Sequence, residues 1–199
     1  MSLELINTLG TVTTVVIVAA AAIAALVQLR HLRAGNQINA MLSIGAELQS
    51  EAFQAAQDIV SGQLKSALED AIFRNYNTAL GRSLPLPAVE PRYIDLRRAV
   101  IRIGNSIEEL GILVKNGIVD KNLFLDRYNF VVVRNWNNLE SFTALSRDAT
   151  GRSALWENFE YLTVLCQDWE RRYPSTYPKG VRRMQLHNPW PVPPVPATI

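Results

Sequence analysis

Two groups of acidic residues have the type and spacing to suggest acid–base or metal chemistry: Glu108 and Glu109 with Asp120, and Asp126 with Glu140. Adjacent residues on a helix point in different directions, and none of these acids has the partner histidine of the Glu-x-x-His arrangement in di-iron bundles. We therefore interpret them as solvated surface acids. No metal site is expected among them.

The other candidates for nucleophiles and metal ligands are few. The only cysteine, Cys166, falls on an apolar helical stripe between Leu162 and Trp169, where a free thiol behaves as a small hydrophobic side chain. The two histidines, His31 and His187, are far apart in sequence. The stretches GRSLPLP and GTVTTVV lack the spacing and the lysine of a phosphate-binding loop. We predict that the protein is not an enzyme, with no catalytic residue and no cofactor.

The overall charge argues against a polyanionic partner. The chain has 20 Lys and Arg residues against 18 Asp and Glu residues, a formal net charge of +2. So small an excess does not indicate nucleic-acid binding. Trp136, Trp156 and Trp169 have helical spacing, which favours packing inside the fold over base stacking. No nucleic-acid partner is expected.

The most distinctive segment is an apolar run near the N-terminus, residues 5–29, which contains no charged side chain. As a helix it would rise roughly 37 Å, more than the roughly 30 Å of a bilayer's hydrocarbon core. A cleaved signal peptide is one alternative, but no Lys or Arg precedes the run, and it is longer than the apolar part of most signal peptides. A buried core helix is the other, but one of this length would normally carry a charge. We predict a single transmembrane helix.

Basic residues on one side of the run predict its orientation. Arg30, His31 and Arg33 follow it directly and no Lys or Arg precedes it, so the N-terminus should lie outside and the main domain in the cytoplasm. We expect these three residues at the membrane interface, in contact with lipid. Small residues four apart would let another membrane helix approach closely. They are Gly10 with Thr14, Ala20 with Ala24, and Ala21 with Ala25.

The remainder of the chain has the apolar period of helices that bury one face. The first stripe predicts one long helix that continues from the membrane to the proline-rich loop starting at Gly81, with Gly35, Gly45 and Gly62 as points where it could divide. Its members are Ile38, Met41, Leu48, Ala52, Ala56, Ile59, Leu64, Leu68, Ile72 and Tyr76. Further helices are expected over residues 92–115, 120–147 and 153–173. The fold class is therefore all-α, an antiparallel helical bundle with sequence neighbours side by side.

Local signals mark the ends of these helices. Asn116 and Gly117 are typical of a left-handed helix stop, with Ile118 packing back on the last turn, and Asp120 is the predicted N-cap of the next helix. Residues 131–133 are β-branched and locally resemble a strand, but they continue a helical period. Ion pairs between the last two helices are expected from Arg134, Arg147, Asp148 and Glu157.

A proline-rich tail follows the last helix, because proline blocks further helix and favours extended polyproline II conformation. A basic cluster in the tail suits anionic lipid head groups, and the stiff PVPPVP sequence suits an aromatic groove on a partner. A solvated or self-packed tail is the alternative. The predicted partner-binding residues are Lys179, Arg182, Arg183, Trp190, Pro191, Pro193, Pro194 and Pro196.

The runs NSIEELGILVKNGIVDKNLFLDRY, RNWNNLESFTALSRD and LWENFEYLTVLCQDW resemble a family of uncharacterised bacterial proteins classed as a domain of unknown function. The architecture that this resemblance implies is one N-terminal membrane helix followed by a helical cytoplasmic domain. The resemblance covers residues 5–169 and implies this architecture and a bacterial inner membrane, but no reaction. The shared residues are Glu108, Gly111, Gly117, Trp136, Leu139, Arg147 and the string FEYL at residues 159–162.

These features predict three parts: an anchor with its basic flank at residues 1–33, a helical domain at 34–173 and an extended tail at 174–199. Our leading hypothesis is a non-enzymatic accessory or scaffold subunit that binds a larger membrane complex, for example a photosynthetic or respiratory assembly. The alternative is a membrane-tethered ligand-binding or signalling domain that acts alone or as a homo-oligomer. That alternative predicts a pocket or buried polar cluster between the helices.

Overall fold

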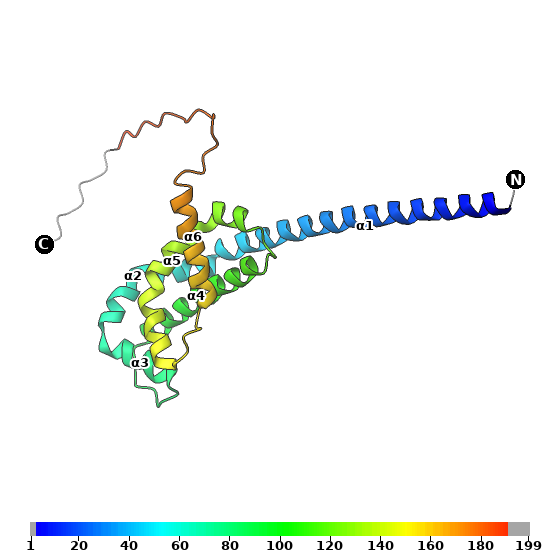
Figure 1. The fold of residues 1–199 in the computed structure, drawn as a ribbon. Coiled ribbons are helices and arrows are strands. Elements are labelled where there is room, and N and C mark those ends of the chain that lie inside the picture. The colour runs from blue at the N-terminus through cyan, green and yellow to red at the C-terminus, as the bar shows by residue number, and fades with distance from the viewer. Residues whose placement is uncertain (1–2, 191–199) are drawn as a thin grey trace.

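The computed structural model describes residues 3–190, without the side chains of residues 4–6, 8 and 9, and is all-helical over that range (Figure 1). No strand occurs in the described part of the chain, and residues 131–133 are helical, as predicted. The helices are α1 (Leu3–Leu48), α2 (Glu51–Glu69), α3 (Ala71–Gly81), α4 (Pro91–Lys115), α5 (Lys121–Thr150) and α6 (Glu157–Arg172).

The first helix is a long rod that projects from a compact helical domain (Figure 1). Only its C-terminal end enters the domain, where Met41, Ile44 and Leu48 are buried. Every described side chain from Gly10 to Asn36 is exposed. The prediction of one long apolar N-terminal helix followed by helices with buried faces is confirmed.

The prediction of one continuous helix up to the proline-rich loop is wrong, because two capping residues divide it. α1 ends at Leu48, and Ser50 caps α2 by accepting a hydrogen bond from the backbone N–H of Phe53 at 3.2 Å. Asp70 caps α3 in the same way, through the N–H of Ile72 at 2.8 Å. Neither break is at a glycine, since Gly35, Gly45 and Gly62 all lie within helices.

Each break rotates the following helix relative to the expected stripe. Ala52 and Ile72 are therefore exposed, although the continuous period placed them on the buried face. Ile38 was placed on the same face, but it precedes both breaks and is exposed on the part of α1 before the first buried residue, Met41. Phe53, Val60 and Phe73 take the core positions instead. A period is only meaningful within one uninterrupted helix.

The core is built between helices that are mostly not neighbours in sequence. α5 and α6 pack on each other, as expected for sequence neighbours, but α2 packs chiefly on α4, α4 on α6 and α3 on α5. Five phenylalanines fill the interior and are almost completely buried: Phe53, Phe73, Phe124, Phe142 and Phe159. α4 contributes the predicted stripe: Leu96, Val100, Ile103, Ile107, Leu110 and Val114 are all buried.

The turn between α4 and α5 has the predicted capping chemistry with one correction. Gly117 has a φ of +65°, and the N–H of Ile118 donates to the carbonyl of Leu113 at 3.0 Å, which is the expected left-handed stop. Asp120 caps α5 by accepting from the N–H of Leu123 at 2.9 Å. However, Ile118 stays 49% exposed, and Val119 makes the buried apolar contact instead.

Asp70 also links α3 to α4, because its carboxylate accepts a hydrogen bond from the Tyr93 hydroxyl. This bond, followed by the bond from the N–H of Ile72, lowers the pKa of Asp70 from 3.8. The same bond to Asp70 raises the pKa of Tyr93 above 10.0. The bond therefore stabilises the fold only while Asp70 is ionised and Tyr93 is protonated.

We expect the stability difference between the wild type and Tyr93→Phe to depend on pH at both ends. Since the folded pKa of Asp70 is lowered, its contribution is present above pH 3.8 and is lost as pH falls through the folded value. Since that of Tyr93 is raised, its contribution is present below pH 10.0 and is lost as pH rises further. Urea midpoints measured from pH 3 to 11 test this, and a difference that is constant over that range would contradict it.

Candidate functional site

The projecting part of α1 is an apolar surface that no other described element covers. Within residues 3–190, α1 is the one helix long and apolar enough to cross a membrane, and none of its most apolar window is buried in the domain. A core helix of a soluble protein would be mostly buried, whereas a signal sequence fits the same length and composition. The exposed side chains of this segment include Val12, Val15, Val16, Ile17, Val18, Ile23, Leu26 and Leu29.

The predicted helix-packing residues lie on this exposed rod. Gly10, Ala20, Ala21, Ala24 and Ala25 are all exposed. The hydroxyl of Thr14 donates to the carbonyl of Gly10 at 2.9 Å, so its polar atom is satisfied within the helix. The hydroxyl of Thr14 therefore needs no hydrogen-bond partner from outside the helix.

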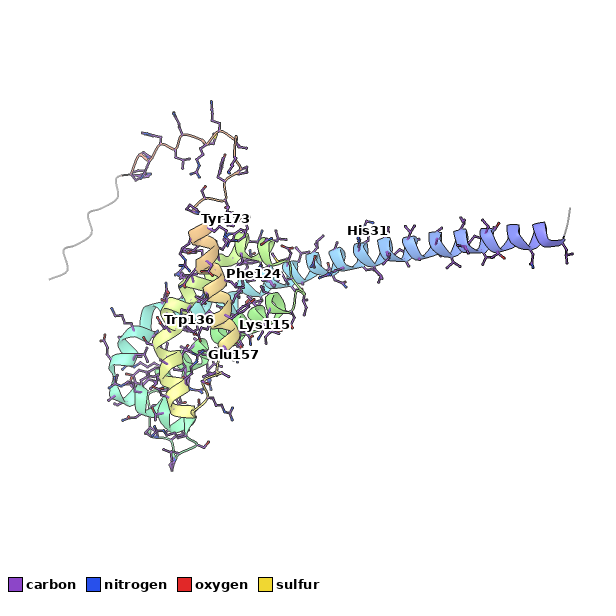
Figure 2. All side chains as sticks on the ribbon, viewed as in Figure 1. His31, Lys115, Phe124, Trp136, Glu157 and Tyr173 are labelled. Atoms are coloured by element: carbon purple, nitrogen blue, oxygen red, sulfur yellow. The ribbon has the colours of Figure 1, made fainter. Side chains whose placement is uncertain are left out.

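The predicted interface residues lie between the apolar run and the domain. Arg30, His31 and Arg33 are exposed on α1, and Figure 2 shows His31 on the projecting rod, well away from the other labelled residues. Gln37 is the first side chain after them that is partly buried. The basic flank is therefore free of the domain.

The tail leaves the domain at Tyr173 and has no helix up to Trp190 (Figure 2). Lys179, Arg182 and Trp190 are exposed. Arg183 stacks on the Tyr177 ring at 4.9 Å and donates to the hydroxyl of Ser175 at 2.6 Å, so part of the predicted basic cluster folds on itself. Four predicted partner-binding residues lie outside the described residues: Pro191, Pro193, Pro194 and Pro196.

Among the acids, Glu108 is not the solvated side chain that we expected. Its carboxylate accepts hydrogen bonds from the side chain of Asn158 at 2.7 Å and from the N–H of Phe159 at 2.8 Å. Trp156, the N-cap of α6, provides no side-chain bond. Glu108 on α4 therefore supplies the cap of α6, while Glu109 beside it is exposed, as predicted.

Two glycines of α4 allow this close junction with the start of α6. A Cβ at Gly104 would lie 2.2 Å from the Trp156 ring, and one at Gly111 would lie 2.3 Å from the carbonyl oxygen of Asn158. Trp156 is buried with a positive φ of 55°, and its ring N–H donates to Asn105 at 3.0 Å. These residues position α6, and sequence reasoning missed their role because they meet only in three dimensions.

The predicted ion pairs between α5 and the α6 region are only partly correct. Arg147 does tie them, but its partner is Glu160 at 2.7 Å, and it also donates to the carbonyl of Leu155 at 3.0 Å. Arg134, Asp148 and Glu157 form no ion pair in the described part of the chain. α6 begins at Glu157 and not near residue 153. Glu160 therefore lies opposite Arg147, in place of the predicted partner Glu157.

Cys166 is fully buried on α6, as the apolar stripe predicted. Burial raises the pKa of its thiol from 9.0 to about 12. The thiolate is the reactive form, so its population at pH 8 falls on the order of a thousandfold.

We expect Cys166 to resist a maleimide reagent at pH 8 in the native protein and to react readily in denaturant. A cysteine introduced at the exposed Leu84 provides the control, because it should react at once in native protein. Mass spectrometry of the modified chain gives both rates. Rapid native labelling of Cys166 would show that the α6 stripe opens frequently.

A polar pocket of about 350 Å³ is lined by residues of α3, α4 and α5 and of the segment before α6. Asn77 Oδ1 and Arg97 Nε are buried there, and no group among the described residues bonds to either atom. Arg152 also lines it, with no acidic side chain. Within the described residues, no group of three or more His, Cys, Asp and Glu side chains has a metal-binding arrangement.

Comparison with known proteins identifies the family. The sequence between residues 15 and 166 matches DUF4760, a domain of unknown function. No curated protein and no solved structure matches the chain significantly. The matched region runs from the apolar part of α1 through Cys166 of α6, which is most of the chain. The protein therefore belongs to the DUF4760 family.

Proposed function

We propose that the protein is a single-pass membrane protein whose helical domain binds another membrane protein, as an accessory or scaffold subunit. The single observation that carries this is the exposure of every described side chain from Gly10 to Asn36, in a helix with no charge over residues 5–29. Water would solvate such a surface poorly, whereas lipid would cover it at no cost.

The charge distribution supports an orientation with the N-terminus outside and the domain in the cytoplasm of a bacterial inner membrane. Arg30, His31 and Arg33 are exposed immediately beyond the apolar run, where they would meet lipid head groups. The smooth face formed by the small residues of α1 would accept a membrane helix of the partner. The exposed tail, with the exposed side chains of Lys179 and Trp190, provides a second contact for the partner.

The experiment is extraction from the native host membrane followed by native mass spectrometry in a mild detergent. The protein should resist an alkaline carbonate wash and then run in a large complex of fixed stoichiometry. Release by carbonate would overturn the anchor. A chain that runs alone or as a homo-oligomer would overturn the accessory-subunit proposal.

A matched pair of variants tests the anchor itself. Val18→Arg with Ile23→Arg places two charges in the apolar run and should move the chain to the soluble or aggregated fraction. Leu32→Arg with Asn36→Arg adds the same charge to exposed positions beyond the run and should leave the chain in the membrane. Equal behaviour of the two variants would contradict a spanning α1.

The polar pocket favours a second candidate, a membrane-tethered domain that binds a small organic acid. Arg97 and Arg152 would receive its carboxylate, and Asn77 Oδ1 would accept a hydroxyl or amine proton of the same molecule. Titration of small hydroxy and amino acids should then raise the melting temperature of the wild type but not of Arg97→Gln. No shift with any such acid would exclude this candidate.

A further inference from the structure

The turn between α4 and α5 is the part of the domain that reaches furthest along α1 towards its N-terminal end (Figure 1). We call residues 115–123 the proximal turn. Its level along α1 follows from two contacts. Glu47 of α1 accepts from Ser106 of α4 at 3.1 Å, and a Cβ at Gly45 would lie 3.0 Å from the hydroxyl of Tyr128 in α5.

Both contacts place the proximal turn beside the same part of α1. Lys115 lies nine residues beyond Ser106, or about 13 Å along α4, and Lys121 lies seven residues before Tyr128, or about 10 Å along α5. Measured back along α1 from Glu47 and Gly45, both distances end at Ile38, which is the furthest level that the proximal turn could reach if α4 and α5 ran alongside α1. Gln37 and Ala40 are partly buried, which agrees with this level.

The basic flank of α1 lies only a short distance further. From Ile38 back to Arg30 the helix rises about 12 Å, without a break. The head groups extend about 5–7 Å beyond the hydrocarbon core on each side, and membrane helices are tilted by about 20° on average. An extended lysine side chain of the proximal turn can therefore reach the head groups of a membrane that ends near Arg30. A tilt of α1 towards the turn brings the shorter isoleucine and leucine side chains to the same surface.

The side chains of the proximal turn suit such a surface. Ile118 is 49% exposed and Leu123 is 51% exposed, although Val119 between them is buried. Lys121 is exposed, and the carboxylate of Asp120 is already bonded to the N–H of Leu123. A half-exposed apolar pair beside a free ammonium group is the composition of an interfacial contact with anionic lipid.

We propose that the proximal turn contacts the anionic head groups of the same membrane that α1 spans, with Ile118 and Leu123 inserted at the surface and Lys121 near the lipid phosphates. This inference rests on the proposed transmembrane anchor. It adds a second fixed point, which holds the domain at one orientation to the bilayer. The partner would then meet a defined face of the domain.

The test uses spin labels on the full chain in phosphatidylcholine nanodiscs with and without phosphatidylglycerol. Labels replace three residues of similar exposure, one in each variant. Ile118 lies on the proximal turn, Leu84 lies in the loop between α3 and α4, and Val18 lies in the apolar run of α1. Native Cys166 is buried and can stay. The ratio of collisions with oxygen to collisions with a water-soluble nickel complex reports the lipid contact of each label.

We expect the ratio at Ile118 to lie between those at Leu84 and Val18 and to rise with phosphatidylglycerol. Adding Lys121→Glu should abolish that rise, and the variant should fold because an acid suits the first turn of α5. A ratio at Ile118 equal to that at Leu84, with Val18 in lipid, would overturn the inference alone. A ratio at Val18 equal to that at Leu84 would overturn the proposed anchor as well. If Lys121→Glu did not change the effect of phosphatidylglycerol, the proposed contact between Lys121 and the lipid phosphates would be overturned.

Discussion

Gly111→Ala is expected to destabilise the domain by about 3 kcal/mol, the upper part of the range for overpacking a core. The new Cβ would lie 2.3 Å from the carbonyl oxygen of Asn158 and 2.7 Å from its carbonyl carbon. Backbone atoms at the start of α6 cannot rotate away as a side-chain end can, so α6 must shift from α4. That shift would also stretch both hydrogen bonds to Glu108.

The control is Gly62→Ala in the exposed middle of α2, where nothing lies within 4 Å of a Cβ. There alanine should stabilise the helix by about 0.5–1 kcal/mol through its higher propensity. Thermal unfolding of the full chain in detergent, followed by near-ultraviolet circular dichroism, compares the two. Opposite signs are expected, with a fall of about 6–12 °C for Gly111→Ala. Equal shifts would mean that α4 and α6 do not pack this closely.

The sequence predicted α4 almost residue by residue, because one uninterrupted helix obeys one period. It also predicted the stop at Gly117 and the cap at Asp120, since both signals are local. It failed to predict the two breaks, where Ser50 and Asp70 each restart the helix. Most of the predicted stripe is nevertheless on the buried side, including Met41, Leu48, Ala56, Leu64 and Tyr76. Serine and aspartate are common on helix surfaces, so neither stands out as a boundary without its hydrogen bond.

The candidate site also has features that the sequence predicted and features that it did not. The exposed apolar rod and its basic flank follow from composition, and the structure leaves those residues uncovered, as a membrane helix requires. The α4–α6 junction was missed, because Glu108 and Phe159 are far apart in sequence and their bond depends on how two helices cross. The polar pocket was missed for a related reason: the unpaired state of Arg97 Nε and Asn77 Oδ1 is a property of packing.

Removing the carboxylate of Glu108 should cost about 2–3 kcal/mol, because two donors lose a charged acceptor at once. The N–H of Phe159 belongs to the first turn of α6, where Trp156 offers no side-chain cap, so no other described group can replace the bond. Asn158 also accepts from Lys115 at 3.1 Å. The carboxylate therefore holds the start of α6 and, through Asn158, the end of α4.

Three variants separate the cap from the general cost of substituting a helical acid. Glu108→Ala should lose the full amount, while Glu108→Gln keeps one acceptor oxygen and should lose about half. Glu109→Ala, at the exposed neighbouring position, should change the free energy of unfolding by no more than about 0.5 kcal/mol. Urea unfolding followed by tryptophan fluorescence measures all three. If Glu108→Ala matched Glu109→Ala, α6 would not depend on Glu108 for its N-terminal cap. The junction would then be held by its other contacts, which are the close packing at Gly104 and Gly111 and the bond from Trp156 to Asn105.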